Sequence, residues 1–194
     1  MERFANENLT LPVLIQAALL HYQFETIHPF LDGNGRLGRL LIVFFLIAKG
    51  RLTEPLLYVS GYFEKRRDDY YDALQGVRER GDLDTWLTMF LDAVRAQADD
   101  AVLRAEKLLD LRESYRARVQ KATRSAAQGL VDLLFEHPVL SARDVERRIG
   151  VTRPAALAAL RRLEAEGFLS PAAPGARGQL RWRAHEVLEI LLTD

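Results

Sequence analysis

The chain has 194 residues, and its 27 Lys and Arg balance its 27 Asp and Glu, so the formal net charge is zero. That balance argues against a protein that coats nucleic acid, and the absence of cysteine excludes disulfides, thiolate catalysis and cysteine-ligated metals. The first residues lack the apolar core of a signal peptide, and the longest apolar run, residues 40–48, is too short to cross a bilayer, so we expect a soluble cytoplasmic protein.

Helical periodicity dominates the first part of the chain. Apolar residues at helical spacing predict a helix that ends just before residue 28. The residues that lie on one face of it are Leu11, Leu14, Ile15, Ala18, Leu19 and Tyr22. A second, largely buried helix is expected after a short loop, with its core positions at Leu37, Leu40, Leu41, Phe44 and Phe45. Gly50 is suited to end this helix, because glycine adopts the left-handed conformation common at helix C-termini.

The next expected helices are more polar. A charged and aromatic stretch runs from residue 62 to residue 80, and Gly81 closes it. Asp84 is the predicted N-cap of a helix that carries Trp86 and Phe90 in its core. Between residues 99 and 120 apolar positions keep helical spacing among many charges, which predicts a long solvent-facing helix. Such a helix is suited to pack on a second copy of the chain or to bridge two domains.

Composition changes near residue 122, and we place a domain boundary there, between residues 1–121 and 122–194. Helices are expected at about 125–136, 141–148 and 153–166. Two strand-like segments then flank a tip rich in Pro and Gly, which predicts a β-hairpin. A helix-turn-helix followed by a hairpin is a winged-helix arrangement. The expected fold class is therefore mainly α, with an all-helical core followed by a winged helix-turn-helix domain.

The polar loop HPFLDGNGRLGR, residues 28–39, separates the first two apolar helices. The proline after His28 disfavours helical geometry, so the first helix should end at that histidine. Residues 33–35 place backbone amides at the positive end of the next helix, which is a physical arrangement that holds phosphate. Arg36 and Arg39 lie one helical turn apart, and each can bind phosphate oxygens through two nitrogens.

Two further side chains complete the chemistry of this loop. Asp32 is its only acid and is suited to hold a magnesium ion against the phosphates. His28 is its one group able to take a proton from a hydroxyl near neutral pH. Taken singly, each feature has an ordinary structural explanation, such as a capping histidine, an Asp-Gly turn or a solvated arginine face. Their combination within twelve residues indicates transfer of a phosphate-containing group.

The loop resembles the signature of the Fic (filamentation induced by cAMP) family, HPFx(D/E)GNGRxxR, at every fixed position. The flanking segments HYQFETIHPF and LYVSGYFEKRRDDYYDAL resemble bacterial Fic proteins with a C-terminal winged helix. The resemblance implies an adenylyltransferase that moves AMP from ATP to a Tyr, Thr or Ser hydroxyl of a target protein, with Mg²⁺ as cofactor. Doc kinases of the same superfamily have lysine and a different pattern of small residues where this chain has Gly35 and Arg36. Transfer of another phosphate-containing group is therefore the less favoured alternative.

The same resemblance assigns a role to each matched residue. His28 would be the base that deprotonates the target hydroxyl, and Asp32 would hold Mg²⁺ between the α- and β-phosphates. Phe30 would be a buried anchor of the loop. Asn34 would also orient the α-phosphate, while Arg36 and Arg39 would hold the β- and γ-phosphates. The complete expected nucleotide-binding set is Gly33, Asn34, Gly35, Arg36, Gly38, Arg39, Tyr70 and Tyr71, in which the tyrosines resemble a family pair near the adenine.

Two features of many Fic proteins are not found in this sequence. The closest match to the inhibitory motif (S/T)xxxE(G/N), residues 60–65, has Lys65 in place of Gly or Asn. Only 27 residues precede His28, too few for an upstream inhibitory helix and a target-aligning hairpin. We therefore expect the chain to be the C-terminal portion of a longer protein, and we expect no removal of AMP by it.

The expected partners are an unidentified target protein, a second copy of the chain and DNA, and no membrane. Arginines on the presumed recognition helix and wing would suit DNA phosphates, and they are Arg153, Arg161, Arg162, Arg177, Arg181 and Arg183. Glu164 and Glu166 share that helix, so a winged helix that binds protein is an equal expectation. A DNA-binding regulator with a nonfunctional Fic core is the rival hypothesis, and the intact loop motif counts against it.

Overall fold

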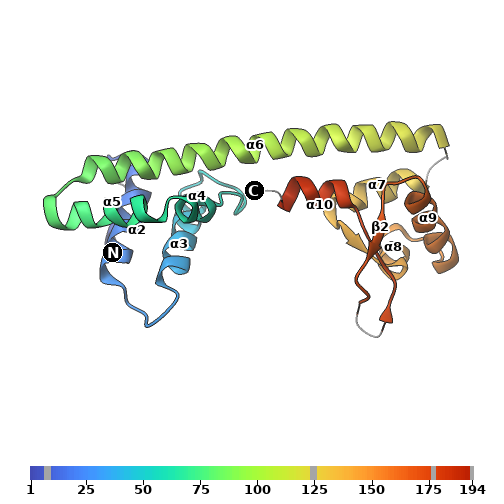
Figure 1. Cartoon of the computed structure of the whole chain (residues 1–194), viewed down its shortest axis with the longest axis horizontal. Helices are drawn as coiled ribbons and strands as arrows, with labels where there is room; N and C mark the ends of the chain where they lie inside the picture. The colour runs from blue at the N-terminus through green and yellow to red at the C-terminus, as the bar shows by residue number, and fades with distance from the viewer. Residues whose placement is uncertain (7–9, 123–125, 176–177, 193–194) are drawn as a thin grey trace. The chain divides into compact units, whose positions relative to one another are not determined.

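The computed structural model describes residues 1–6, 10–122, 126–175 and 178–192, with side chains outside 120–128 (Figure 1). The chain divides into two compact units, residues 1–102 and 103–194. Helix α6 (Leu83–Ala122) contributes to both units. The domain boundary predicted near residue 122 falls at the end of α6, beside residues 123–125, which lie outside the described part, and it stays a prediction.

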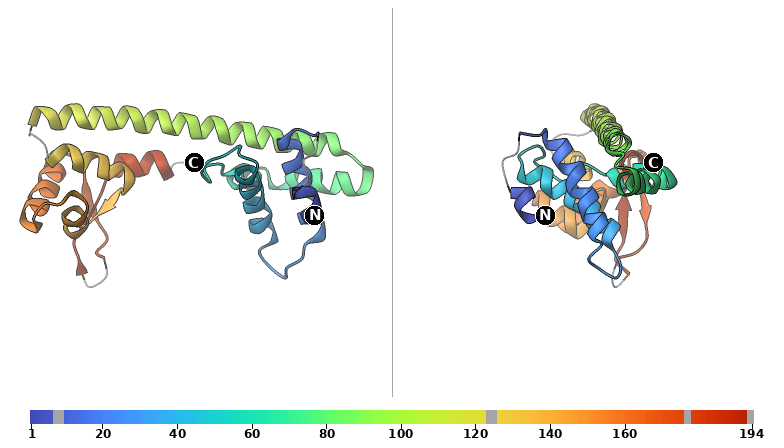
Figure 2. Two further views of the ribbon diagram at one scale, coloured as in Figure 1. Left: turned by 180° about the vertical axis from the view of Figure 1, so that it is seen from behind. Right: turned by 90° about the vertical axis from the view of Figure 1, so that its left-hand side faces the viewer.

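The first unit is built from helices. They are α1 (Glu2–Asn6), α2 (Val13–Ile27), α3 (Asn34–Ala48), α4 (Val59–Lys65), α5 (Arg67–Arg80) and the N-terminal part of α6. Helices α2 and α3 pack side by side, and the loop of residues 28–33 joins them at one end, as Figures 1 and 2 both show. This pairing places the polar loop where two apolar helices meet.

The core of the first unit is aromatic. Trp86 and Phe90 of α6 are completely buried, as predicted, and pack with Phe63 of α4 and Tyr70 of α5. The indole nitrogen of Trp86 donates a hydrogen bond to the Ala18 carbonyl oxygen at 3.1 Å, which ties α6 to α2. These contacts form a rigid layer behind the α2–α3 pair.

The face predicted for α2 is partly confirmed, since Ala18 is buried and Leu14 and Tyr22 pack against the core, whereas the face predicted for α3 was largely wrong. Leu11 precedes α2 and is exposed, while the buried residues of α2 are Gln16, Ala17, Ala18, Leu20, His21 and Phe24. Leu37, Leu40 and Phe44 are exposed, while the buried residues of α3 are Asn34, Gly38, Ile42, Val43, Phe45 and Leu46. Both helices carry apolar residues all round, so the pattern alone could not show which face meets the core.

The predicted helix ends are mostly confirmed. Gly50 and Gly81 have φ of 66° and 69° and follow α3 and α5. The N-cap predicted at Asp84 was wrong, because α6 begins at Leu83 and the Asp82 carboxylate accepts hydrogen bonds from the Thr85 amide (3.2 Å) and hydroxyl (2.8 Å). These hydrogen bonds lower the pKa of Asp82.

The second unit combines helices with a small sheet. Its elements after α6 are α7 (Ala126–Glu136), β1 (Val139–Leu140), α8 (Ala142–Ile149), α9 (Arg153–Ala165), β2 (Ser170–Ala172), β3 (Arg181–Arg183) and α10 (His185–Leu192). The sheet is antiparallel in the order β1-β3-β2. The predicted helices and hairpin are confirmed, whereas β1 and α10 were not predicted. The mainly α fold class is also confirmed.

A separate core holds the second unit together. Tyr115 and Val119 of α6 are buried there with Leu160 of α9, Phe168 and Trp182. The Tyr115 hydroxyl donates a hydrogen bond to the Glu186 carboxylate of α10 at 2.5 Å. Between residues 99 and 114 of α6 every residue is exposed or half-buried, as predicted for a solvent-facing helix. Within the described residues, no helix is both long and apolar enough to cross a membrane.

Candidate functional site

The first feature of the site is the end of α2 at His28. This residue has φ 48° and ψ 58°, and its amide donates a hydrogen bond to the Phe24 carbonyl at 3.0 Å. It is the single non-glycine residue with positive φ in the described part of the chain. The left-handed conformation and the following proline stop the helix here, which confirms the predicted end, and they leave the imidazole exposed.

Asn34 holds the loop closed from inside. Its side chain is buried, accepts a hydrogen bond from the Phe30 amide (3.0 Å) and donates one to the Phe30 carbonyl (2.6 Å). Phe30 itself is 52% exposed, so the prediction of a buried anchor was wrong. The loop is fixed through the backbone of Phe30. Both polar atoms of the Asn34 side chain are thus engaged in holding the loop.

The N-terminus of α3 faces the same space. Gly33 is the N-cap with φ 83°, a conformation that favours glycine, and no side chain caps the helix. The first amides of an α-helix have no intrahelical partner, so those of residues 34–36 are available to an anion. The Gly33 amide donates to the Asp32 carboxylate at 2.6 Å. At Gly35 a Cβ atom would come within 3.1 Å of the Arg39 guanidinium, so glycine leaves that side chain room.

A hollow of about 380 Å³ collects these groups with residues of α4 and α5. All of the predicted site residues except Gly38 line it. The lining residues are His28, Leu31, Asp32, Gly33, Asn34, Gly35, Arg36, Arg39, Phe63, Glu64, Arg67, Tyr70 and Tyr71. The fold therefore brings together residues separated by some forty positions in the sequence.

The two predicted arginines differ in how firmly they are held. The Arg39 Nε donates a hydrogen bond to the Ser60 hydroxyl of α4 at 2.9 Å. Arg36 is exposed, and its guanidinium lies 3.4 Å from the equally exposed Asp32 carboxylate. An exposed ion pair of this kind contributes little to stability, so Arg36 can turn toward a ligand at small cost. Arg39 is the preorganised cation of the hollow.

The two predicted tyrosines also differ. Tyr70 is 4% exposed, and its hydroxyl lies 2.9 Å from the His21 Nε2; burial raises the pKa of this phenol. Tyr71 is 53% exposed, with the Arg67 guanidinium 5.6 Å from the centre of its ring. An exposed ring with a cation over it is suited to stack on a base, so Tyr71 is the better placed of the two.

Gly38 has a packing role. A Cβ atom there would lie 2.3 Å from the Glu25 Oε1 and 3.0 Å from the His21 ring, so glycine allows α3 to approach α2. His21 is completely buried, which lowers its pKa to about 4 and keeps it neutral. Burial raises the pKa of Glu25, against the opposing charges of His28 and Arg39.

Four residues near the loop were not predicted. His21 and Glu25 lie behind it, and the Glu25 Oε2 is 3.8 Å from the His28 Nδ1, a place from which a carboxylate can orient the imidazole. Ser60 holds Arg39, and Glu64 lines the hollow. The available signal was the spacing of His21 and Glu25, which lie at i and i+4 on a largely apolar helix.

Asp32 fits a magnesium ion that is bound mainly by its substrate. The Asp32 side chain is 94% exposed at the edge of the hollow, and only one of its oxygens accepts the short hydrogen bond from Gly33. Mg²⁺ commonly uses one or two protein carboxylates and takes its other ligands from phosphates and water. Within the described residues, no three His, Asp or Glu side chains gather as a ready-made metal cage.

Comparisons with known proteins point to one family. The Fic/DOC family model matches residues 1–46. A probable protein adenylyltransferase of Aquifex aeolicus is 36% identical over 70 residues, which are 36% of this chain and 19% of that protein. The protein adenylyltransferase Fic of Aedes aegypti is 36% identical over 83 residues, which are 43% of this chain and 15% of that protein. The chain thus covers less than a fifth of these relatives.

A solved structure was also found. A Fic family protein from Desulfovibrio desulfuricans G20 superposes with a TM-score of 0.49 at 24% identity, over 94% of this chain and 52% of that one. The matched segment of the family model ends within α3 and contains the complete loop from His28 to Arg39. The similarity to the Fic/DOC family model therefore rests on the first 46 residues of this chain, which include the loop that carries the site.

Proposed function

We propose that this protein transfers AMP from ATP to a Tyr, Thr or Ser hydroxyl of a target protein. The observation that carries the proposal is the convergence of His28, Asp32, Arg39 and the α3 N-terminus on one hollow. The proposal is supported by two similar proteins named protein adenylyltransferase, which are 36% identical over 70 and 83 residues. A base, an anion-binding helix end and a fixed cation are the groups that nucleotidyl transfer needs.

The residues suggest how the reaction proceeds. The His28 imidazole accepts the proton of the target hydroxyl, whose oxygen forms a bond to the α-phosphorus of ATP. The bond from that phosphorus to the bridging oxygen breaks, and pyrophosphate leaves. The amides of residues 34–36 hold the charge on the phosphate oxygens, and Arg39 binds the departing phosphates. Asp32 would hold Mg²⁺, which neutralises phosphate charge when bound.

Labelled ATP tests which group is transferred. The chain is incubated with Mg²⁺ and a host lysate, in parallel with α-labelled and γ-labelled ATP, and modified peptides are identified by mass spectrometry. Protein labelling from the α-phosphate alone is the expected result. Labelling from the γ-phosphate would contradict AMP transfer and favour the alternative of phosphate transfer.

Single variants test the assigned roles. His28→Ala should reduce labelling more than about 100-fold while ATP affinity by calorimetry stays within about twofold, because a general base acts mainly on the chemical step. Arg39→Ala should weaken ATP binding itself. Arg51→Ala is the matched control, since this exposed arginine follows α3 outside the hollow. Equal loss of binding in the His28 and Arg39 variants would refute the division of labour.

The second unit supports a further part of the proposal, that it is a winged helix. The element order α7-β1-α8-α9-β2-β3 and the strand order β1-β3-β2 are those of a helix-turn-helix with a hairpin wing. Of the arginines predicted on the wing, Arg177 lies outside the described residues.

A further inference from the structure

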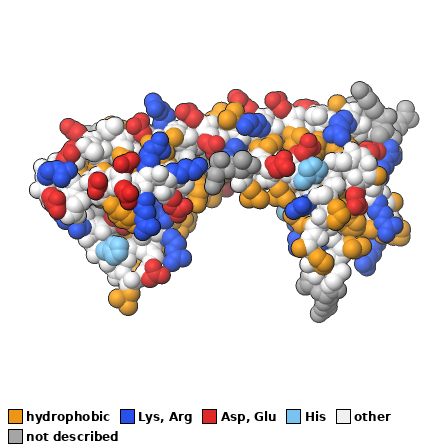
Figure 3. Space-filling view, in the orientation of Figure 1, with side chains coloured by type: hydrophobic (Ala, Val, Ile, Leu, Met, Phe, Trp, Pro, Cys, Tyr) orange, Lys and Arg blue, Asp and Glu red, His pale blue; other side chains and the backbone are white. Residues whose placement is uncertain are grey.

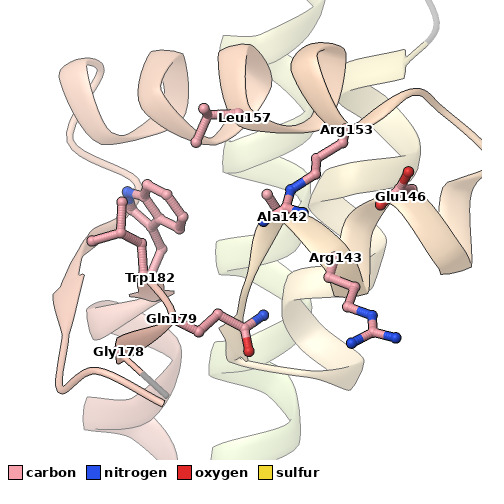
Figure 4. Close-up of a pocket in the computed structure, with 9 residues that line it drawn as sticks. Ala142, Arg143, Glu146, Arg153, Leu157, Gly178, Gln179 and Trp182 are labelled. Atoms are coloured by element: carbon pink, nitrogen blue, oxygen red, sulfur yellow. The ribbon is translucent and has the colours of Figure 1, made fainter. Parts of the chain in front are cut away.

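The second unit has a hollow of about 740 Å³ where α8, α9 and the β2–β3 hairpin meet. Figure 4 shows side chains from all three around it, with Arg143 from α8, Arg153 from α9 and Gln179 from the hairpin segment. Trp182 of β3 and Leu157 of α9 supply apolar walls. The hollow is separate from the nucleotide-binding hollow of the first unit and shares no residue with it.

The acids around this hollow are mostly engaged in holding the fold. Asp144 forms a capping box with Ser141 at the start of α8 and also pairs with Arg147 at 3.2 Å. Glu164 accepts a hydrogen bond from the Trp182 indole at 2.7 Å, and Glu166 pairs with Arg162 at 2.8 Å. Arg147 and Arg162 therefore compensate the charges of Asp144 and Glu166, whereas the neutral indole leaves the charge of Glu164 in place.

The arginines that line or flank the hollow are not compensated in the same way. Within the described part of the chain, Arg143, Arg153 and Arg181 form no ion pair with a carboxylate, and each is exposed. Glu146 is the one acid among the lining residues. Arg143, Arg153 and Arg181 therefore supply positive potential to the solvent-facing side of this region, beside the single acid Glu146 in the lining.

The outer face of α9 has a shape that suits a groove. Ala155 and Ala158 are exposed on it, between Arg153 at its first turn and Arg161 at its third. Small side chains allow the helix backbone to approach a ligand closely, with a cation at each end of the approach. Figure 3 shows Lys and Arg side chains along the edge of the unit over α9.

The hairpin is fastened beside this helix. The Trp182–Glu164 hydrogen bond joins β3 to α9, and the Arg183 Nε donates to the Ser170 hydroxyl of β2 at 3.1 Å. The Gly175 amide donates to the Gln179 carbonyl at 2.9 Å and closes the hairpin. Arg181 is therefore carried on a fixed support next to α9.

We propose that the second unit binds duplex DNA, with the N-terminal half of α9 in the major groove and Arg143 and Arg181 on the flanking phosphates. The N-terminal half of α9 presents small residues and arginines to the groove. Arg143 on α8 and Arg181 on the hairpin contact the DNA backbone on either side. An acidic protein could bind these arginines without a helix face that fits a DNA groove. The shape of α9 therefore favours duplex DNA over an acidic protein.

The test uses the complete chain and a fluorescein-labelled 30-base-pair duplex of mixed sequence, followed by anisotropy. We count one phosphate contact each for Arg143, Arg153 and Arg181. Three contacts predict that the binding constant falls about 40-fold between 50 and 200 mM salt, since its logarithm changes with the logarithm of the salt concentration with a slope of about −0.9 per contact. Arg143→Gln, Arg153→Gln or Arg181→Gln should each remove one contact and reduce this fall to about 12-fold.

Arg147→Gln is the matched control, because Arg147 lies on the same helix as Arg143 but pairs with Asp144. It should leave the salt dependence unchanged, and circular dichroism verifies that all variants are folded. Absence of binding at 50 mM salt would overturn the proposal, as would equal effects of the control and the three variants. Competition by poly-glutamate as effective as by unlabelled duplex would also overturn it, in favour of an acidic protein partner.

Discussion

At the scale of single residues, the reactive loop rests on a buried layer of polar groups. His21 packs against Phe63 and Trp86 and forms a hydrogen bond with the Tyr70 hydroxyl. Gly38 of α3, opposite His21, leaves just enough space for the imidazole. A neutral histidine satisfies the tyrosine hydroxyl without bringing a charge into the core. The same burial makes the layer sensitive to acid.

His21 should make the first unit less stable in acid. Its pKa is lowered to about 4 from 6.5 when folded, so the unfolded chain binds a proton first as the pH falls. The free energy of unfolding should therefore decrease between pH 6.5 and 4, by about 3 kcal/mol from this residue. Urea unfolding from pH 7 to pH 4 measures the change, and His21→Gln should remove that part of it. An unchanged pH dependence in the variant would contradict the assignment.

At the scale of elements, helix contacts and caps decide how the loop is presented. Helix α3 approaches α2 at a glycine, and the loop between them is closed by Asn34. In the second unit α8 begins with a capping box, whereas α9 begins at Thr152 without a side-chain cap. These differences predict unequal responses to similar substitutions.

Gly38→Ala should destabilise the first unit by about 1–3 kcal/mol, because the added methyl group collides with Glu25 and His21 and overpacks the helix contact. Gly129→Ala in α7 is the control, since a Cβ atom there would lie 3.8 Å from an Ile149 methyl group, which is an ordinary van der Waals contact. There alanine should stabilise by about 0.5–1 kcal/mol through helix propensity. Thermal unfolding of both variants gives the comparison, and a neutral Gly38→Ala would refute the packing role.

Ser141→Ala should cost about 1 kcal/mol, because the Ser141 hydroxyl accepts from the Asp144 amide and donates to the Asp144 carboxylate, and both bonds are lost. Thr152→Ala should cost much less, since the Thr152 side chain makes no capping hydrogen bond. Urea unfolding of the second unit, followed by Trp182 fluorescence, distinguishes the two. Equal losses would show that the cap is not the source of the difference.

At the scale of the whole molecule, two cores are built on one chain. The chain has two tryptophans, and Trp86 is buried in the first core while Trp182 is buried in the second. Each unit therefore carries its own fluorescent reporter of folding. Each also carries its own hollow, one suited to nucleotide phosphates and one to a polyanion.

The two units should unfold in separate transitions. Trp182→Phe leaves Trp86 to report on the first unit, and Trp86→Phe leaves Trp182 to report on the second. In urea the two midpoints should differ, and ATP with Mg²⁺ should raise only the midpoint reported by Trp86, because the ligand stabilises the unit that binds it. A single midpoint that ATP shifts equally for both reporters would contradict independent cores.

Many of the helix ends and the reactive loop could be read from the sequence, because local chemistry decides them. The proline after His28 stops α2, Gly33 begins α3, and Gly50 and Gly81 end helices, each through conformational preferences that need no distant contact. The twelve-residue loop likewise contains its own base, acid, amides and arginines. Its similarity to the Fic/DOC family model also rests on residues that are neighbours in the chain.

Tertiary structure decided which side of each apolar helix is buried and what lies behind the loop. Helices α2 and α3 are apolar on several faces, so their rotation depends on the close approach at Gly38 and on Trp86 from α6. The hydroxyl of Ser60 reaches Arg39 only because α4 folds over α3. Periodicity describes one helix at a time, whereas these contacts join segments distant in the sequence, and such contacts are made only when the chain has folded.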